Sequence, residues 1–142
     1  MERRTFLKTS CNFCLLGMTG GLLSQLEACS PTFQVTRADI VGGSLTIPLA
    51  TFTQSGLQII RPNGWYYNIA VHKKTDGSYE SMLLQCTHQQ NQLAPTGNGF
   101  TCTLHGSQFD AEGQVKKGPA ERSLKKFPTS LDGDKLIIHL NT

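Results

Sequence analysis

Alternation of apolar and polar residues constrains the fold of this chain more than any other feature. In WYYNIAVHKK (65–74), the apolar side chains at 65, 67, 69 and 71 fall on one face of an extended strand. The stretches 44–50 and 134–140 alternate in the same way, and 79–86 is apolar on both faces near its end. After residue 30 no window of about twelve residues carries a helical repeat. We therefore expect strands.

Turn sequences separate these runs. They are PNG (62–64), DG (76–77), GNG (97–99), EG (112–113) and DG (132–133). Glycine and asparagine adopt the positive φ angles that tight connections need. Several short strands joined in this way favour an antiparallel all-β domain. Pro48 within the first strand indicates a sheet edge or a bulge, because proline lacks the N–H that a central strand donates.

The first 28 residues differ from the rest of the chain. Arg3 and Arg4 precede Phe6 and Leu7, and residues 11–26 carry no charge. A basic start before an apolar run is typical of an export signal. The paired arginines resemble a twin-arginine signal, which suits proteins exported already folded around a cofactor. An ordinary secretory signal that begins with two arginines is the alternative.

The apolar run ends in a sequence that resembles a lipobox. Leu26, Ala28 and Cys29 fit that pattern, in which the cysteine is lipidated and becomes the new N-terminus, whereas Glu27 departs from it. The alternative is an uncleaved anchor, because residues 9–26 are nearly long enough to span a bilayer. Either arrangement tethers the domain on the periplasmic or extracytoplasmic side of the membrane.

The length of the chain limits the number of domains, and its net charge limits the kinds of partner. The chain has 142 residues, which is enough for one domain with a modest core. We expect a linker at 29–43 and the folded domain at 44–142. The net charge is +3, and removing residues 1–28 drops three bases and two acids, which leaves +2. This small, scattered charge excludes a nucleic-acid partner.

Two short stretches carry the chemistry. QCTH (85–88) contains Cys86 and His88, and CTLHGSQFD (102–110) contains Cys102 and His105. Two strand ends can bring these loops face to face, where thiolates and imidazoles suit either zinc or an iron–sulfur cluster. A disulfide is a further possibility in an exported protein, but it leaves both histidines unexplained. A Cys–His catalytic pair is another alternative.

The two spacings together resemble Rieske 2Fe–2S proteins, from about residue 44 to the end of the chain. The matching features are C-x-H, C-x-x-H and the Gly-Ser-x-aromatic-Asp sequence that follows. The resemblance implies one 2Fe–2S cluster per chain, with Cys86 and Cys102 on the inner iron. His88 and His105 are then the ligands of the outer, solvent-facing iron.

The same resemblance assigns roles to three neighbouring features. Gly106 would let the backbone approach the cluster closely, because a Cβ at that position would crowd a sulfide. Ser107 matches the serine whose hydroxyl donates to a bridging sulfide. The sequence GPA (118–120) resembles the loop that covers the cluster and limits its contact with water.

Three departures place the chain in the ferredoxin-like branch of that family. Asn91 and Leu104 stand where the cytochrome bc-type members have two cysteines that form a disulfide. Phe109 stands where high-potential members have a tyrosine that donates to a cysteine sulfur. The spacing between His88 and Cys102 is shorter than in most relatives.

The expected function is one-electron transfer by an exported, membrane-tethered Rieske protein. Its partners would be redox donor and acceptor proteins. The alternative is an electron-transfer subunit of a larger bc-like or periplasmic oxidoreductase complex, and a zinc-stabilised structural lipoprotein is a third hypothesis. The chain has no room for the mononuclear iron domain of an oxygenase, and no residue is assigned a catalytic role. His72 and His139 lie at strand rims and receive no function.

Overall fold

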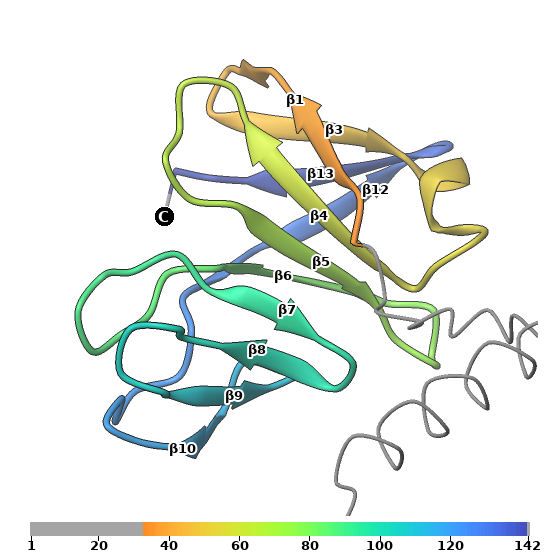
Figure 1. Ribbon diagram of the computed structural model, residues 1–142. Coiled ribbons are helices and arrows are strands. Elements are labelled where there is room, and N and C mark those ends of the chain that lie inside the picture. Colours follow the sequence, from red (N-terminus) through yellow and green to blue (C-terminus); the bar gives the residue numbers. More distant parts are fainter. Residues whose placement is uncertain (1–32, 142) are drawn as a thin grey trace, which may run out of the picture. The chain divides into compact units, whose positions relative to one another are not determined.

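The computed structural model describes residues 33–141, and in this range the chain consists of strands with one short 3-10 helix (Figure 1). The expected signal at 1–28 and the lipidation site Cys29 lie outside the described residues. Within the described range, no helix is long and apolar enough to cross a membrane.

The strands form three sheets. The first has the order β1 (Val35–Ala38), β4 (Leu57–Pro62), β5 (Ile69–Lys73), β6 (Tyr79–Leu83), β11 (Lys126–Phe127). The second has the order β12 (Thr129–Asp132), β13 (Lys135–His139), β3 (Ser44–Pro48), β2 (Ile40–Val41), and the 3-10 helix η1 (Leu49–Phe52) follows β3. The third and smallest has the order β10 (Val115–Lys117), β9 (Gln108–Asp110), β8 (Gly99–Thr101), β7 (Ala94–Thr96). This architecture confirms the all-β class.

The first sheet supplies side chains to two hydrophobic cores. One core contains Ile60, Ile69, Val71 and Leu83 of this sheet, packed with apolar residues of β3 and β13. The other contains Ile59, Ala70, Met82 and Leu84, packed with Phe100, Phe109, Cys86 and Cys102. Neighbouring residues of a strand point to opposite faces, so the central strands β4, β5 and β6 have apolar residues on both sides. Complete burial of each large apolar side chain contributes about 1.5–3 kcal/mol.

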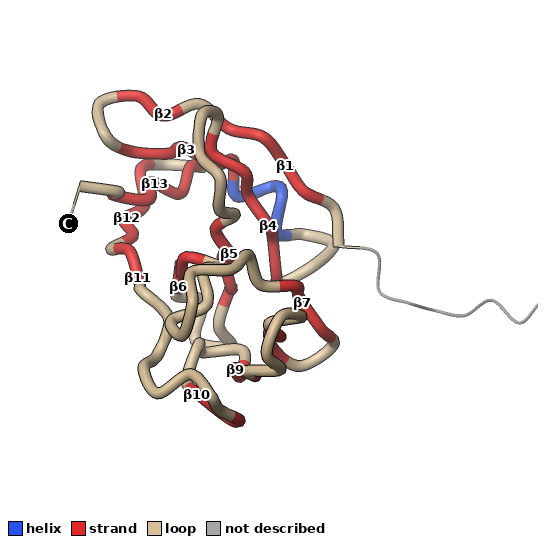
Figure 2. Tube along the Cα trace, turned by 60° about the vertical axis from the view of Figure 1, so that its left-hand side comes forward, coloured by secondary structure: helices blue, strands red, loops and turns tan. Residues whose placement is uncertain are grey.

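The small sheet, β7 to β10, lies at one end of the domain, away from the second sheet, in both views (Figures 1 and 2). It continues the chain after β6, so the connection from β6 to β7 and the turn from β8 to β9 lie beside the second core. These two connections carry the Cys–His stretches. The expected cluster-binding subdomain therefore corresponds to this sheet and its loops.

Two expectations need correction. The segment expected as a linker, 29–43, contains β1 and β2 in its described part. β2 pairs with β3, while β1 pairs with β4 in parallel, which departs from the antiparallel pattern of the other strands. Residues 35–37 are exposed at the sheet edge, so their sequence lacks the apolar alternation of a core strand.

Pro48 does lie at an edge, because the short β2 reaches only the start of β3.

Candidate metal centre

The first Cys–His loop, residues 86–91, is closed by two backbone hydrogen bonds. The N–H of Gln90 donates to the carbonyl of Cys86 at 2.9 Å, and the N–H of Cys86 donates to the carbonyl of Asn91 at 2.8 Å. Gln90 has a positive φ of 50°. The Tyr67 hydroxyl donates to the Gln90 carbonyl at 2.5 Å and holds this turn against the domain.

The second loop, residues 102–107, repeats this frame. The N–H of Gly106 donates to the carbonyl of Cys102 at 2.9 Å, and the N–H of Cys102 donates to the carbonyl of Ser107 at 2.8 Å. Gly106 has a φ of +76°, a conformation that glycine adopts without steric cost. The fifth residue of each loop thus takes a positive φ, and the sixth accepts from the cysteine.

The loops separate their thiols from their imidazoles. Cys86 and Cys102 are only 1% and 2% exposed, and both are free thiols. His88 and His105 are exposed. Their rings meet edge to face, with centroids 5.1 Å apart and an interplanar angle of 82°. The structure therefore brings all four predicted residues to one site, with sulfur inside and nitrogen at the surface.

The surroundings of Cys102 favour ionisation of its thiol. Burial disfavours the thiolate, but hydrogen bonds from the backbone N–H groups of His105 and Leu104 outweigh that effect, with the side chains of Cys86 and Asn91 contributing. Together they lower the pKa of Cys102 below its ordinary value. The thiolate is the form that binds metals, so the surroundings of this sulfur favour a ligand.

Ser107 is fully buried and joins the second loop to a third. Its hydroxyl oxygen accepts the backbone N–H of Ala120 at 3.0 Å, and a hydroxyl that accepts in this way still has its own proton to donate. For Gly106, a Cβ would meet no protein atom within 4 Å. In the structure, glycine is needed at position 106 for its positive φ, and not to avoid a clash with other protein atoms.

The third loop also contacts the first. The Thr87 hydroxyl donates to the carbonyl of Arg122 at 2.6 Å, and the Arg122 guanidinium lies 3.5 Å from the carbonyl of Thr87. The segment 118–122, which contains the GPA sequence, therefore bridges both Cys–His loops. Ala120 is buried in the second core, whereas Pro119 is exposed.

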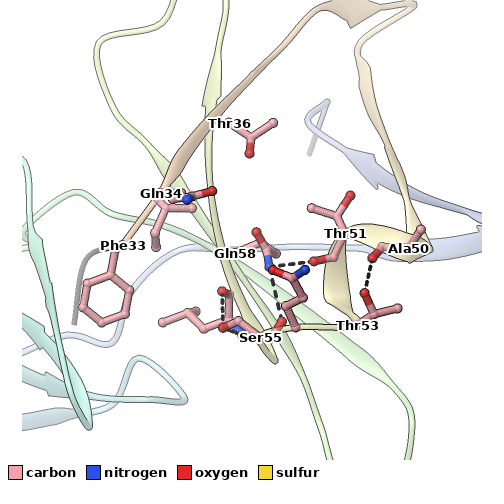
Figure 3. A pocket seen from close by; sticks show the side chains of 11 residues that line it. Phe33, Gln34, Thr36, Ala50, Thr51, Thr53, Ser55 and Gln58 are labelled. Atoms are coloured by element: carbon pink, nitrogen blue, oxygen red, sulfur yellow. Dashed lines mark hydrogen bonds between the residues drawn. The ribbon is translucent and has the colours of Figure 1, made fainter.

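Other features of the described domain do not assemble comparable chemistry. His139 contacts the hydroxyls of Ser130 at 2.9 Å and Ser44 at 3.4 Å, and His72 is half-buried on β5. A hollow of about 490 Å³ lies between the start of β1 and the η1 region (Figure 3). Threonine, glutamine and apolar side chains line it, and Gln58 donates there to the Thr51 carbonyl at 2.8 Å. Its lining lacks cysteine, histidine and acidic residues.

The donor set fits a two-iron cluster. Two buried thiols and two exposed imidazoles lie at one site. A mixed-ligand 2Fe–2S cluster takes two thiolates on one iron and two imidazoles on the other, which matches this division of donors.

Comparison with known proteins agrees with this geometry. Residues 55–128, which include both Cys–His loops and the third loop, match the model of the Rieske [2Fe-2S] domain. The chain belongs to the Rieske family. It accordingly carries a 2Fe–2S cluster, as the spacing of the four residues predicted.

Three relatives show how far the similarity extends. Cytochrome b6-f complex iron-sulfur subunit 2 of Nostoc sp. is 40% identical over 46% of this chain and 39% of the relative. The Rieske subunit of the mitochondrial cytochrome b-c1 complex of Saccharomyces cerevisiae is 37% identical over 44% and 31%. The matched stretch thus spans less than half of either relative. The crystal structure of the plasma membrane Rieske protein PetC3 from Synechocystis PCC 6803 superposes with a TM-score of 0.54 at 26% identity, over 64% of this chain and 93% of that one.

Sequence reasoning missed two contacts at this site. The Nδ2 of Asn91 donates to the Sγ of Cys102 at 3.8 Å, and the Thr87–Arg122 pair ties the third loop to the first. Neither Asn91 nor Thr87 is one of the four residues proposed as ligands. Asn91 is recognised because it accepts the N–H of Cys86 as Ser107 accepts the N–H of Cys102, and this correspondence can be seen only in the structure.

Proposed function

We propose that this protein is an exported, membrane-tethered one-electron carrier. Its cluster would be held by Cys86 and Cys102 on the inner iron and by His88 and His105 on the outer iron. When bound, the cluster supplies a centre that takes up and releases a single electron. The residues of this chain bind that centre, shield its inner side from water and expose its outer side to a partner.

The separation of thiols and imidazoles carries this proposal. Buried Cys86 and Cys102 lie within the second core, where apolar neighbours exclude water. His88 and His105 form the exposed tip, and Leu104 beside them is 57% exposed. Arg122 and Lys125 line a hollow next to His88, so a partner that docks at this edge meets cationic side chains at its rim as well as the imidazoles. Electron exchange would therefore take place at the histidine edge.

The third loop supports the same function. It bonds to Ser107 of the second loop and to Thr87 of the first, so it holds the two loops in one arrangement. A rigid frame reduces the reorganisation that accompanies a change of charge. Ser107 keeps a hydroxyl proton available for the cluster, and Gly106 supplies the turn that returns the chain to β9.

The membrane tether and the extracytoplasmic location rest on the N-terminal sequence. Arg3, Arg4 and the apolar run resemble an export signal, and Cys29 is the proposed lipidation site. PetC3 of Synechocystis PCC 6803 is a plasma membrane Rieske protein, which supports this placement by analogy. The redox donor and acceptor would then be proteins or membrane oxidoreductase subunits on the same side of the membrane.

A second candidate function is supported by the two relatives from Nostoc sp. and Saccharomyces cerevisiae. Both are subunits of cytochrome complexes, so this chain is alternatively an electron-transfer subunit of a bc-like or periplasmic oxidoreductase complex. Native separation of mildly solubilised membranes distinguishes the two. A carrier migrates as a small single-chain species, whereas a subunit comigrates with haem-containing partners.

Replacement of the ligands tests the proposed site. Cys86→Ser, His88→Ala, Cys102→Ser and His105→Ala should each abolish or cripple cluster assembly, measured as iron and acid-labile sulfide per chain. The reduced wild type should show the low-average-g electron paramagnetic resonance (EPR) spectrum of mixed Cys/His ligation. His72→Ala and His139→Ala are matched controls, because both histidines lie outside the two loops. Stoichiometric zinc without iron in wild-type protein made with sufficient iron would refute the proposal.

A further inference from the structure

Asn91 carries a side chain that the proposed ligand set does not use. Its Nδ2 donates to the Sγ of Cys102 at 3.8 Å and to the backbone carbonyl of Gln92 at 3.3 Å. Both partners are hydrogen-bond acceptors, so the amide group must turn its NH₂ toward them and its oxygen away. The contact with Cys102 runs from the first loop to the sulfur of the second.

Asn91 holds the same place in the first loop that Ser107 holds in the second. Each is the sixth residue of its loop, and each accepts the N–H of the cysteine that opens the loop, at 2.8 Å. Each also carries a side-chain hydrogen-bond donor. The two loops therefore end in equivalent backbone frames with a donor on each, although only the opening Cys-Thr pair is the same in both and the histidine is third in one loop and fourth in the other.

The backbone that carries the Asn91 side chain is fixed by hydrogen bonds within the protein. The backbone carbonyl of Asn91 accepts the N–H of Cys86, and the neighbouring Gln92 pairs with Gln85 in an isolated β-bridge. The Gln92 side chain accepts the backbone N–H of Asn68 at 3.0 Å. A donor held by its backbone on both sides loses little further conformational entropy when it bonds to an anionic sulfur.

We propose that Asn91 is a positioning residue of the iron–sulfur site, which donates an N–H to the Cys102 sulfur and ties the first loop to the second. This inference rests on the proposed ligand role of Cys102. A donor at a ligand sulfur stabilises the more electron-rich, reduced state, so it raises the reduction potential. The same bond resists separation of the two loops and slows loss of the cluster.

Three variants of the full chain test the inference by protein-film voltammetry. Asn91→Leu removes the donor at similar volume and should lower the midpoint potential. Asn91→Asp replaces the amide with a carboxylate that accepts rather than donates, and should lower the potential further. Tyr67→Phe is the matched control, because it removes a hydrogen bond to the same loop at Gln90 without touching a sulfur. Its potential should equal that of the wild type, whereas both Asn91 variants should lose the cluster faster than the wild type.

A measurement on the wild type does not depend on any variant being stable. Protein labelled with ¹⁵N only in asparagine should show a weak ¹⁵N coupling to the reduced cluster in pulsed EPR, because the amide nitrogen is one hydrogen bond from a ligand sulfur. Asn91→Asp, made in the same labelled medium, should lose that coupling if it assembles the cluster.

The outcomes separate cleanly. Absence of the ¹⁵N coupling in a wild type that holds its cluster overturns the inference and leaves the proposed function intact. Equal potential shifts in Asn91→Leu and Tyr67→Phe also overturn it, because loop packing rather than the donor would then set the potential. A wild type without any 2Fe–2S signal overturns the proposed function and this inference together.

Discussion

The backbone N–H of Ala120 donates to the hydroxyl oxygen of Ser107 at 3.0 Å, so the third loop and the second Cys–His loop share one hydrogen bond. Ser107 is fully buried and thus has no access to water as an alternative partner. The hydroxyl therefore serves two purposes in the proposed site. It accepts from the third loop, and its own proton would remain available to the proposed cluster.

Ser107→Ala is expected to lower the reduction potential. A hydrogen bond to a charged group contributes about 1.5–3 kcal/mol, and only part of that differs between oxidation states, which gives a decrease of roughly 50–100 mV. The variant also leaves the N–H of Ala120 without its partner, so faster cluster loss should accompany the shift. Voltammetry and the decay of the visible absorbance measure the two effects. An unchanged potential would show that solvent exposure, rather than this donor, sets it.

Phe109→Tyr is expected to act in the opposite direction. Phe109 is 2% exposed and packs in the same core as Cys86 and Cys102. A tyrosine hydroxyl that reaches a cysteine sulfur should raise the potential by roughly 50–100 mV on the same reasoning. Phe100→Tyr, in the paired strand of the same core, is the control for adding a hydroxyl. An equal rise in both variants would contradict a specific bond at residue 109.

The export signal predicts the fate of a double substitution. Arg3 and Arg4 changed together to lysine should leave folded, cluster-loaded protein in the cytoplasm, because lysine does not replace the paired arginines of the signal it resembles. Cell fractionation followed by EPR measures where the cluster resides. A secretory signal of the ordinary kind would tolerate this change, and normal export of the variant would therefore favour that alternative.

Lipidation at Cys29 has its own test. Growth with a radioactive fatty acid should label the wild type and not Cys29→Ala, since the acyl chains would be attached to this residue. Cys11→Ala and Cys14→Ala should remain labelled. If Cys29→Ala stays in the membrane with its first 28 residues uncleaved, the N-terminal segment is an anchor instead.

Glu80 predicts a pH dependence of stability. Burial alone would favour its neutral form, but the hydrogen bond and charge of Lys126, with Lys74 at 3.5 Å, outweigh it and hold the pKa of Glu80 below its ordinary value. A carboxyl with a lowered pKa in the folded state contributes stability above its unfolded pKa and loses that contribution as pH falls through the folded pKa.

The corresponding measurement compares wild type with Glu80→Gln. The variant should be less stable at neutral pH by about 1 kcal/mol, in the range of a partly exposed ion pair. The difference should shrink as the pH falls below the ordinary range of glutamate. Denaturant unfolding followed by circular dichroism at several pH values gives the free energies. A difference that is constant with pH would contradict the ionic origin.

The four proposed ligands could be predicted from sequence because they are recognised by their spacing within two short segments. Each Cys–His stretch lies at a strand end, and Gly106 turns the chain back only in the second of them. The alternation in 65–74 likewise placed Ile69 and Val71 in a common core, as the structure confirms. β1 could not be predicted in this way, because its exposed residues pair through backbone groups that every residue possesses.

The sequence by itself thus determined the β class, the turns and the four chemistry-bearing residues of this Rieske protein, because strand period, glycine conformation and donor type are properties of short segments. Only the tertiary structure decided that the first sheet serves two cores and that β1 runs parallel to β4. It also decided the contacts of Asn91 with Cys102 and of Ala120 with Ser107. These contacts join separate loops, and an amide or a hydroxyl has many possible partners until the path of the chain selects one.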